Sequence, residues 1–264
     1  MKDRREKLNI AFYVTCDYEE EQFGEVRIGQ AVRSHGISDI QALRLIVDTM
    51  RQFDMEMKFA DADGKQFSVD SFLKRVEKQG RWGGITEAGG LSFSFGGASA
   101  LNNACIYIEE KKANSAISWD AWVAPFLAID GFVQAWITDV EYDYWQNAKD
   151  PLLYELEGRN YSHLPTKSNG LPPPVERLEI DTSNNPGRWS FQSGFIEAIG
   201  SIMWLSPLFW QLVGADCKNT ELSASGFNVQ HEANSIIKVI AADHCFCNES
   251  TESVQRKLRS VLYD

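Results

Sequence analysis

One run of the sequence constrains the fold more than any other: residues 131–151, GFVQAWITDVEYDYWQNAKDP. Read with a period of two residues, one side of the run carries Phe132, Trp136, Val140, Tyr142 and Tyr144, and the other changes from apolar to acidic along its length. Asp139, Glu141 and Asp143 form the acidic part. The pattern predicts one long strand, central in a sheet at its start and half exposed at its end.

A helix is the alternative for the same run, because large apolar residues recur every four positions from Phe132 to Tyr144. We favour the strand, since Val, Ile, Thr and aromatic residues dominate the composition. Gly131 begins the run, and Asp150 precedes a proline, which disfavours helical backbone there.

The chain has 264 residues, enough for one large domain or two smaller ones with a buried core. Its formal net charge of -11 argues against a nucleic-acid-binding protein, because such proteins place Lys and Arg against phosphates. An acidic surface suits a basic protein partner, since opposite charges speed encounter. Solubility alone is the other explanation of the charge.

Neither an export signal nor a membrane segment is predicted. The basic N-terminus leads into a short apolar run at 8–14 without a cleavage-site pattern. The apolar stretches near 121–137 and 195–213 are interrupted by Asp, Gln, Gly or Pro. The dispersed cysteines are expected to be reduced thiols in the cytoplasm: Cys16, Cys105, Cys217, Cys245 and Cys247.

Periodicity and capping residues predict the other elements. Strands are expected at 8–15, 55–60, 91–95, 104–109, 175–181, 189–191 and 236–242. The strands at 91–95 and 104–109 are expected to pair antiparallel through the Gly96-Gly97 turn. Helices are expected at 38–53, 68–78, 119–128, 195–213 with a break at Ser206-Pro207, and 251–263. Residues 158–174 are rich in Pro, Gly, Ser and Asn and are expected to form a loop.

The irregular alternation of these elements, with hairpin-like turns between strands, predicts an α+β fold with mixed, mainly antiparallel sheets and packed helices. The polar stretch 110–118 suggests a boundary near residue 115. We therefore expect an N-terminal α+β subdomain (1–115) and a C-terminal α+β subdomain (116–264).

Complete catalytic signatures are missing from the sequence. The glycine pairs at 83–84, 89–90 and 96–97 do not match a dinucleotide- or phosphate-binding loop. His231 begins a zinc-protease HExxH motif, but Ser235 stands where the second His is needed. No GxSxG motif occurs. We predict that the protein is not an enzyme and uses no cofactor or metal.

Two clusters keep a metal-dependent hydrolase as the alternative. The thiols of Cys245 and Cys247 stand beside the imidazole of His244, which is half of a zinc site. The three acidic residues of the 131–151 run would share a strand face, where they could hold a divalent cation or act as acid and base. A structural module without a partner is a third interpretation.

Acidic residues beside aromatic ones are also typical of protein-binding surfaces. The 131–151 run supplies one such group: Asp139, Glu141, Tyr142, Asp143, Tyr144 and Trp145. A second acidic group follows the first predicted strand: Asp17, Glu19, Glu20 and Glu21.

Four segments of the C-terminal half resemble a known family: EYDYWQNA at 141–148, SNGLPPP at 168–174, NPGR at 185–188 and FIEAIGSIMWLSPLFWQLVGA at 195–215. In this order they resemble immunity-protein family fifty-two of bacterial polymorphic-toxin systems, over about residues 125–245. The resemblance implies a cytoplasmic antitoxin without chemistry of its own. Its partner would be a cognate toxin, such as a nuclease-type effector of type VI secretion, neutralised by stoichiometric occlusion. The acidic and aromatic residues above are the expected toxin-binding residues.

Overall fold

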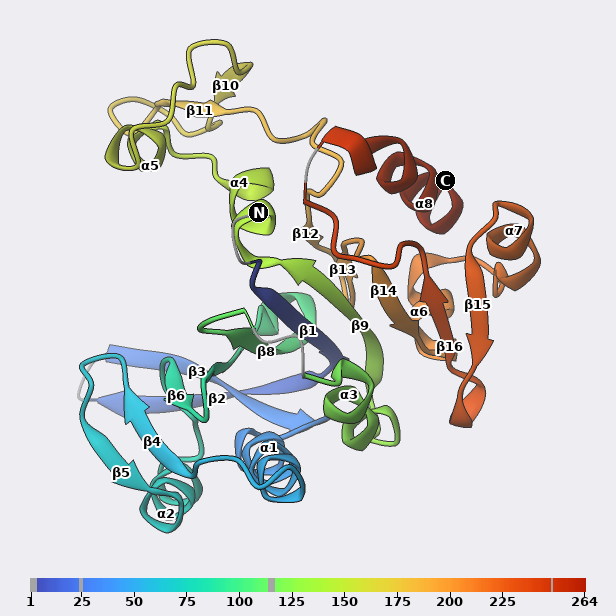
Figure 1. Ribbon diagram of the computed structural model, residues 1–264. Helices are drawn as coiled ribbons and strands as arrows, with labels where there is room; N and C mark the ends of the chain where they lie inside the picture. The colour runs from blue at the N-terminus through green and yellow to red at the C-terminus, as the bar shows by residue number, and fades with distance from the viewer. Residues whose placement is uncertain (1–3, 24–25, 114–116, 248) are drawn as a thin grey trace.

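The computed structural model describes residues 4–23, 26–113, 117–247 and 249–264, without the side chains of 18–23, 26–33 and 249. Its described part forms α-helices together with one large antiparallel sheet and three small ones (Figure 1). This confirms the predicted α+β class. None of the helices in the described ranges has the length and apolar character that crossing a membrane requires.

Ten strands form the large sheet, and every neighbouring pair in it is antiparallel. From one edge to the other the order is β15 (Asn228–His231), β16 (Ile237–Ile240), β14 (Ile202–Leu205), β9 (Phe132–Asp139), β1 (Glu6–Tyr13), β8 (Asn103–Glu110), β7 (Leu91–Gly96), β6 (Thr86–Ala88), β4 (Lys58–Asp61) and β5 (Gln66–Ser68). The sheet continues across residue 115, because β1 pairs with β8 on one side and β9 on the other. The division into two subdomains stays a prediction.

A hydrophobic core lies on each face of the sheet. One core is covered by α1 (Asp39–Gln52), α2 (Val69–Gln79) and α3 (Trp119–Leu127), and the other by α6 (Pro207–Val213), α7 (Asn219–Ala224) and α8 (Glu252–Tyr263). Successive residues of β1 alternate between the two, since Ile10 belongs to the first core and Ala11 to the second. Three short 3-10 helices complete the connections: η1 (Ser99–Leu101), η2 (Ala233–Ser235) and η3 (Glu249–Thr251).

The 131–151 run divides into a strand and a helix. β9 is buried at every residue, as predicted for the first half. The second half is α4 (Val140–Asn147), so the strand prediction was wrong beyond Asp139 and the four-residue spacing was the correct signal there. Asp139 pairs with Glu6, the first residue of β1. Beyond Asp139, β1 therefore offers β9 no further partner residue. A helix satisfies its own backbone groups, and Asp139 caps it by accepting from Tyr142 N at 2.8 Å.

The helix predicted at 195–205 was also wrong. This segment forms β13 (Ile196–Glu197) and β14, which fills the place between β9 and β16. The break at Ser206-Pro207 was correct, because Ser206 caps α6 and accepts from Phe209 N at 3.2 Å. The predicted pairing of 91–95 with 104–109 is confirmed as β7 with β8.

Residues 148–182 form a small unit, which we call the arm, at the top of Figure 1. It contains α5 (Pro151–Leu156) and the hairpin of β10 (Thr166–Ser168) and β11 (Leu178–Ile180). Its core has three buried apolar residues, Ala148, Tyr154 and Ile180. The other small sheets pair β2 (Thr15–Phe23) with β3 (Val26–His35), and β12 (Ser190–Phe191) with β13.

Candidate functional site

A groove of about 680 Å³ lies between α4, the arm and the ends of β1 and β8. Its lining combines charged and aromatic side chains and comes from segments far apart in the sequence. The lining residues are Arg5, Lys7, Glu109, Val140, Glu141, Asp143, Tyr144, Trp145, Asn147, Ala148, Lys149, Leu153, Glu157, Arg159 and Trp189. Four of the residues predicted to bind a partner are among them: Glu141, Asp143, Tyr144 and Trp145.

The acids of the 131–151 run do not share a strand face, which corrects the sequence-based prediction. Asp139 is the last residue of β9 and is buried as the cap of α4, whereas Glu141 and Asp143 lie on the helix itself. Burial raises the pKa of Asp139 despite its hydrogen bond from Tyr142 N. Glu141 is exposed and Asp143 is buried.

Tyr142, the next predicted contact residue, belongs to the packing of the protein. Its ring packs against the second core, and Gln255 Nε2 on α8 donates to its hydroxyl at 2.9 Å. Asp139 and Tyr142 therefore hold α4 in place, and neither lines the groove.

A partly buried ion pair lines the groove. Lys7 Nζ on β1 is 3.6 Å from Asp143 Oδ2 and 4.8 Å from the centroid of the Tyr107 ring. Burial raises the pKa of Asp143, and the neighbouring Lys7 ammonium opposes that shift. The pair joins α4 to the sheet, and the Lys7 ammonium balances the charge of the Asp143 carboxylate at the groove.

Arg159 of the arm closes the groove on one side. Its guanidinium carbon lies 4.2 Å from the Trp145 ring centroid, and its Nη2 lies 2.5 Å from Glu141 Oε1. Trp145 also packs edge-on against Tyr144, with ring centroids 4.9 Å apart. Behind the Trp145–Arg159 stack is a second hollow of about 470 Å³, which the same two side chains help to line. The Trp145–Arg159 stack therefore lies between the groove and this second hollow.

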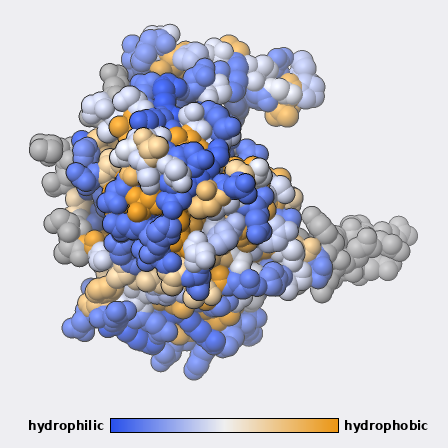
Figure 2. Space-filling view, turned by 90° about the vertical axis from the view of Figure 1, so that its right-hand side faces the viewer, coloured by the Kyte–Doolittle hydropathy of each residue, from blue (hydrophilic) through white to orange (hydrophobic). Residues whose placement is uncertain are grey.

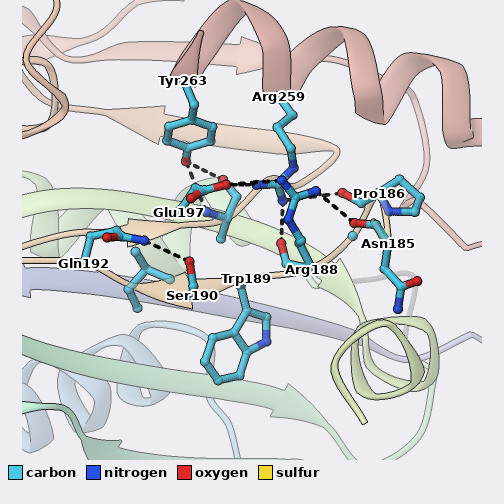
Figure 3. A network of polar contacts seen from close by, with 12 residues as sticks. Asn185, Pro186, Arg188, Trp189, Ser190, Gln192, Glu197, Arg259 and Tyr263 are labelled. Atoms are coloured by element: carbon cyan, nitrogen blue, oxygen red, sulfur yellow. Dashed lines mark hydrogen bonds and ion pairs between the residues drawn. The ribbon is translucent and has the colours of Figure 1, made fainter. Parts of the chain in front are cut away.

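Trp189 completes the aromatic rim and was not among the residues predicted to bind a partner. The preceding NPGR segment is held by Arg259 of α8, which donates to the carbonyl oxygens of Pro186 and Arg188 (Figure 3). Figure 3 shows the Trp189 ring pointing away from this network. Trp189 N also donates to Asn147 Oδ1 at 2.8 Å, which fixes the residue against the end of α4. The sequence feature that could have pointed to Trp189 is its position directly after the NPGR segment.

The second predicted acidic group is on β2, in the hairpin with β3. Asp17 is exposed there and pairs in register with Val32. Glu19, Glu20 and Glu21 lie on the same strand, and their side chains are outside the described residues.

The His244, Cys245 and Cys247 cluster does not converge on a point. His244 is exposed, whereas Cys245 is buried and its Sγ lies 3.2 Å from Glu6 Oε1. Burial raises the pKa of the Cys245 thiol, and the Glu6 carboxylate raises it further. Throughout the described ranges, no three His, Cys, Asp or Glu side chains are grouped so that they could hold a metal ion.

The solved structure of the Pseudomonas aeruginosa T6SS protein PA0821 shares this fold. The TM-score is 0.51 at 10% sequence identity, and the match covers 98% of this chain and 72% of that chain. No protein-family model and no curated protein matches the sequence. At this identity the likeness establishes a common fold. Membership of immunity family fifty-two stays a prediction.

Proposed function

We propose that this protein is an immunity protein of a type VI secretion system, which binds a cognate toxin and blocks it without chemistry of its own. The groove carries the proposal: Tyr144 and Trp189 are exposed aromatic side chains at its rim, next to the exposed carboxylate of Glu141. Large aromatic side chains with nearby charges usually contribute much of the binding energy at protein interfaces. The shared fold with a protein named for the T6SS supports the choice of system.

The mode of action that suits this surface is occlusion. A net charge of -11 attracts a basic partner, and a nuclease-type toxin carries a basic cleft for its substrate. The aromatic rim would pack on the edge of that cleft while acidic residues occupy the place of phosphates. The complex would form in the cytoplasm of the producing cell, one molecule to one toxin.

Co-expression with the product of the neighbouring gene tests the proposal. The wild-type protein should restore growth and elute with that product as one complex in gel filtration. Failure of both rejects the function.

The Tyr144→Ala/Trp189→Ala variant should weaken the complex at least about tenfold, because two aromatic anchors are lost. Phe53→Ala is a matched control, since Phe53 is 43% exposed against 46% for Tyr144 and lies at the end of α1, outside the groove. If the two variants bind the toxin with equal affinity, the toxin contacts a surface other than the groove.

A further inference from the structure

The arm is a small unit that carries many of the exposed apolar side chains. Of the ten large apolar side chains exposed in the described part of the chain, five lie on the arm and two more, Tyr144 and Trp189, border the groove. The five are Leu152, Leu156, Leu171, Val175 and Leu178. The top of Figure 2, where the arm lies, shows apolar residues among polar ones. Such concentration on one small unit marks an interaction surface.

Part of this surface is on a loop with a defined shape. Residues 169–177 turn around Asn169, whose Oδ1 accepts from Leu171 N and Arg177 N at 3.2 Å each. Asn169 Nδ2 donates to Val175 O at 3.0 Å, and Asn169 N donates to Arg177 O at 3.0 Å. The loop is thus ordered before any partner arrives, so little conformational entropy is lost on binding.

An ion pair joins this loop to α5. Arg177 Nη1 lies 3.4 Å from Asp150 Oδ2, and Asp150 caps α5 by accepting from Leu152 N. Leu152 and Leu156 stand four residues apart and therefore share one face of the helix. The exposed leucines of α5 and the exposed side chains of the loop belong to one connected unit.

The charges on the arm are unequally compensated. Three of the four Lys and Arg side chains on the arm have a carboxylate partner: Arg159, Lys167 and Arg177. The fourth, Lys149, has none within 4.0 Å among the described residues. Glu155, Glu157 and Glu176 are exposed, and none of them has a Lys, Arg or His nitrogen within 4.0 Å among the described residues. The arm therefore presents leucines and uncompensated carboxylates together, which fits a partner with basic residues around an apolar depression.

We propose that the arm is a second docking element, through which α5 and the 169–177 loop bind a basic, partly apolar surface of the cognate toxin. This inference rests on the proposed function and extends the contact from the groove to the outer face of the arm. The acids accelerate encounter, and the leucines slow dissociation once they are buried.

Binding of the purified product of the neighbouring gene by three variants tests the docking element. Leu152→Ser/Leu156→Ser should raise Kd at least about tenfold, mainly through faster dissociation. Glu155→Gln/Glu176→Gln, at two exposed carboxylates outside the groove, should slow association and flatten its dependence on salt. Ile85→Ser, at a side chain 53% exposed outside the arm, and Asp63→Asn/Asp216→Asn, with the same change of charge, are the controls and should bind as the wild type does.

The outcomes separate the two proposals. If only groove variants weaken binding and the arm variants stay within about twofold of the wild type, the docking element is rejected and the immunity function stands. If the wild-type protein forms no complex, both are rejected. If the wild type is a dimer that Leu152→Ser/Leu156→Ser converts to a monomer, the surface binds a second copy of this chain and the inference is wrong. Unchanged circular dichroism and urea midpoints would show that these exposed substitutions leave the fold intact.

Discussion

Arg259 Nη1 on α8 lies 2.6 Å from Glu197 Oε1 on β13. The same guanidinium donates to the main-chain carbonyl oxygens of Pro186 and Arg188, and its side chain is almost completely buried. One cation thus joins the last helix, a small sheet and the segment that leads to Trp189 (Figure 3). The position of Trp189 on the rim of the groove thus depends on Arg259, which holds the preceding residue, Arg188, from 71 positions further along the sequence.

Replacing this cation should destabilise the protein. Arg259→Met leaves two carbonyl oxygens without their charged donor and leaves the partly buried Glu197 carboxylate with Arg188, 3.6 Å away, as its remaining cation. We expect a loss of about 3 kcal/mol or more in the free energy of unfolding. Arg51→Met is the control, because Arg51 is exposed and pairs with Asp48 one turn away on α1, which predicts a loss below about 1 kcal/mol. Urea unfolding measures both, and similar losses would contradict the assigned role of Arg259.

The buried Asp143 predicts a specific pH dependence. Burial raises its folded-state pKa above the ordinary 3.8, so the folded protein binds this proton more tightly than the unfolded chain does. The contribution of Asp143 to stability is therefore greatest below pH 3.8 and falls as the pH rises through the raised value. Asp143→Asn should gain stability relative to the wild type between about pH 4 and pH 7. The exposed control Asp63→Asn should show no such trend, and a gain in the opposite direction for Asp143→Asn would contradict the burial argument.

The five thiols should differ widely in reactivity. Cys217 is exposed, whereas burial raises the pKa of Cys105 to about 11 and also raises that of Cys245. Since the thiolate is the reactive form, an aromatic disulfide reagent should modify Cys217 first in native protein and reach Cys105 and Cys245 only after unfolding. Cys217→Ser should remove the fast phase. A fast phase that persists in this variant would assign it to another thiol.

Gly200 packs directly on β9. A Cβ at this position would lie 2.5 Å from Ile137 O and 2.9 Å from Ile137 N, so β9 or the 198–201 segment has to move. Gly200→Ala should cost about 1–3 kcal/mol by thermal or urea unfolding. Gly96→Ala has open space around its Cβ and should change stability by less than about 0.5 kcal/mol. If Gly200→Ala leaves the free energy of unfolding unchanged, β9 can shift at Ile137 at little energetic cost.

Asn169 should control the order of the arm loop. Asn169→Ala removes the acceptor of Leu171 N and Arg177 N, and each such hydrogen bond contributes about 0.5–1.5 kcal/mol. Hydrogen exchange at these two amides should accelerate about tenfold while the sheet amides are unchanged. Asn169→Asp keeps an acceptor oxygen and should restore most of the protection. Protection that survives in Asn169→Ala would show that other contacts order the loop.

Several elements could be predicted from the sequence because short-range signals specify them. The amphipathic spacing of α1, α2 and α8, and the Ser206-Pro207 start and Gly214 end of α6, are set by residues within one or two turns. The antiparallel pairing of β7 with β8 likewise follows from alternation and a nearby turn. These signals were sufficient for the α+β class and for placing Glu141, Tyr144 and Trp145 in one acidic and aromatic segment.

Only the tertiary structure decided where that segment changes from strand to helix, because the apolar spacing from Phe132 to Tyr144 fits both periods. β1 begins at Glu6, opposite Asp139, and this distant partner ends the ladder on that side of β9. The same change of backbone buries Asp139 and Asp143, leaves Glu141 and Tyr144 exposed, and brings Trp189 beside them through Arg259. Local sequence cannot specify such an arrangement, since burial and hydrogen-bond partners depend on which remote segments pack together.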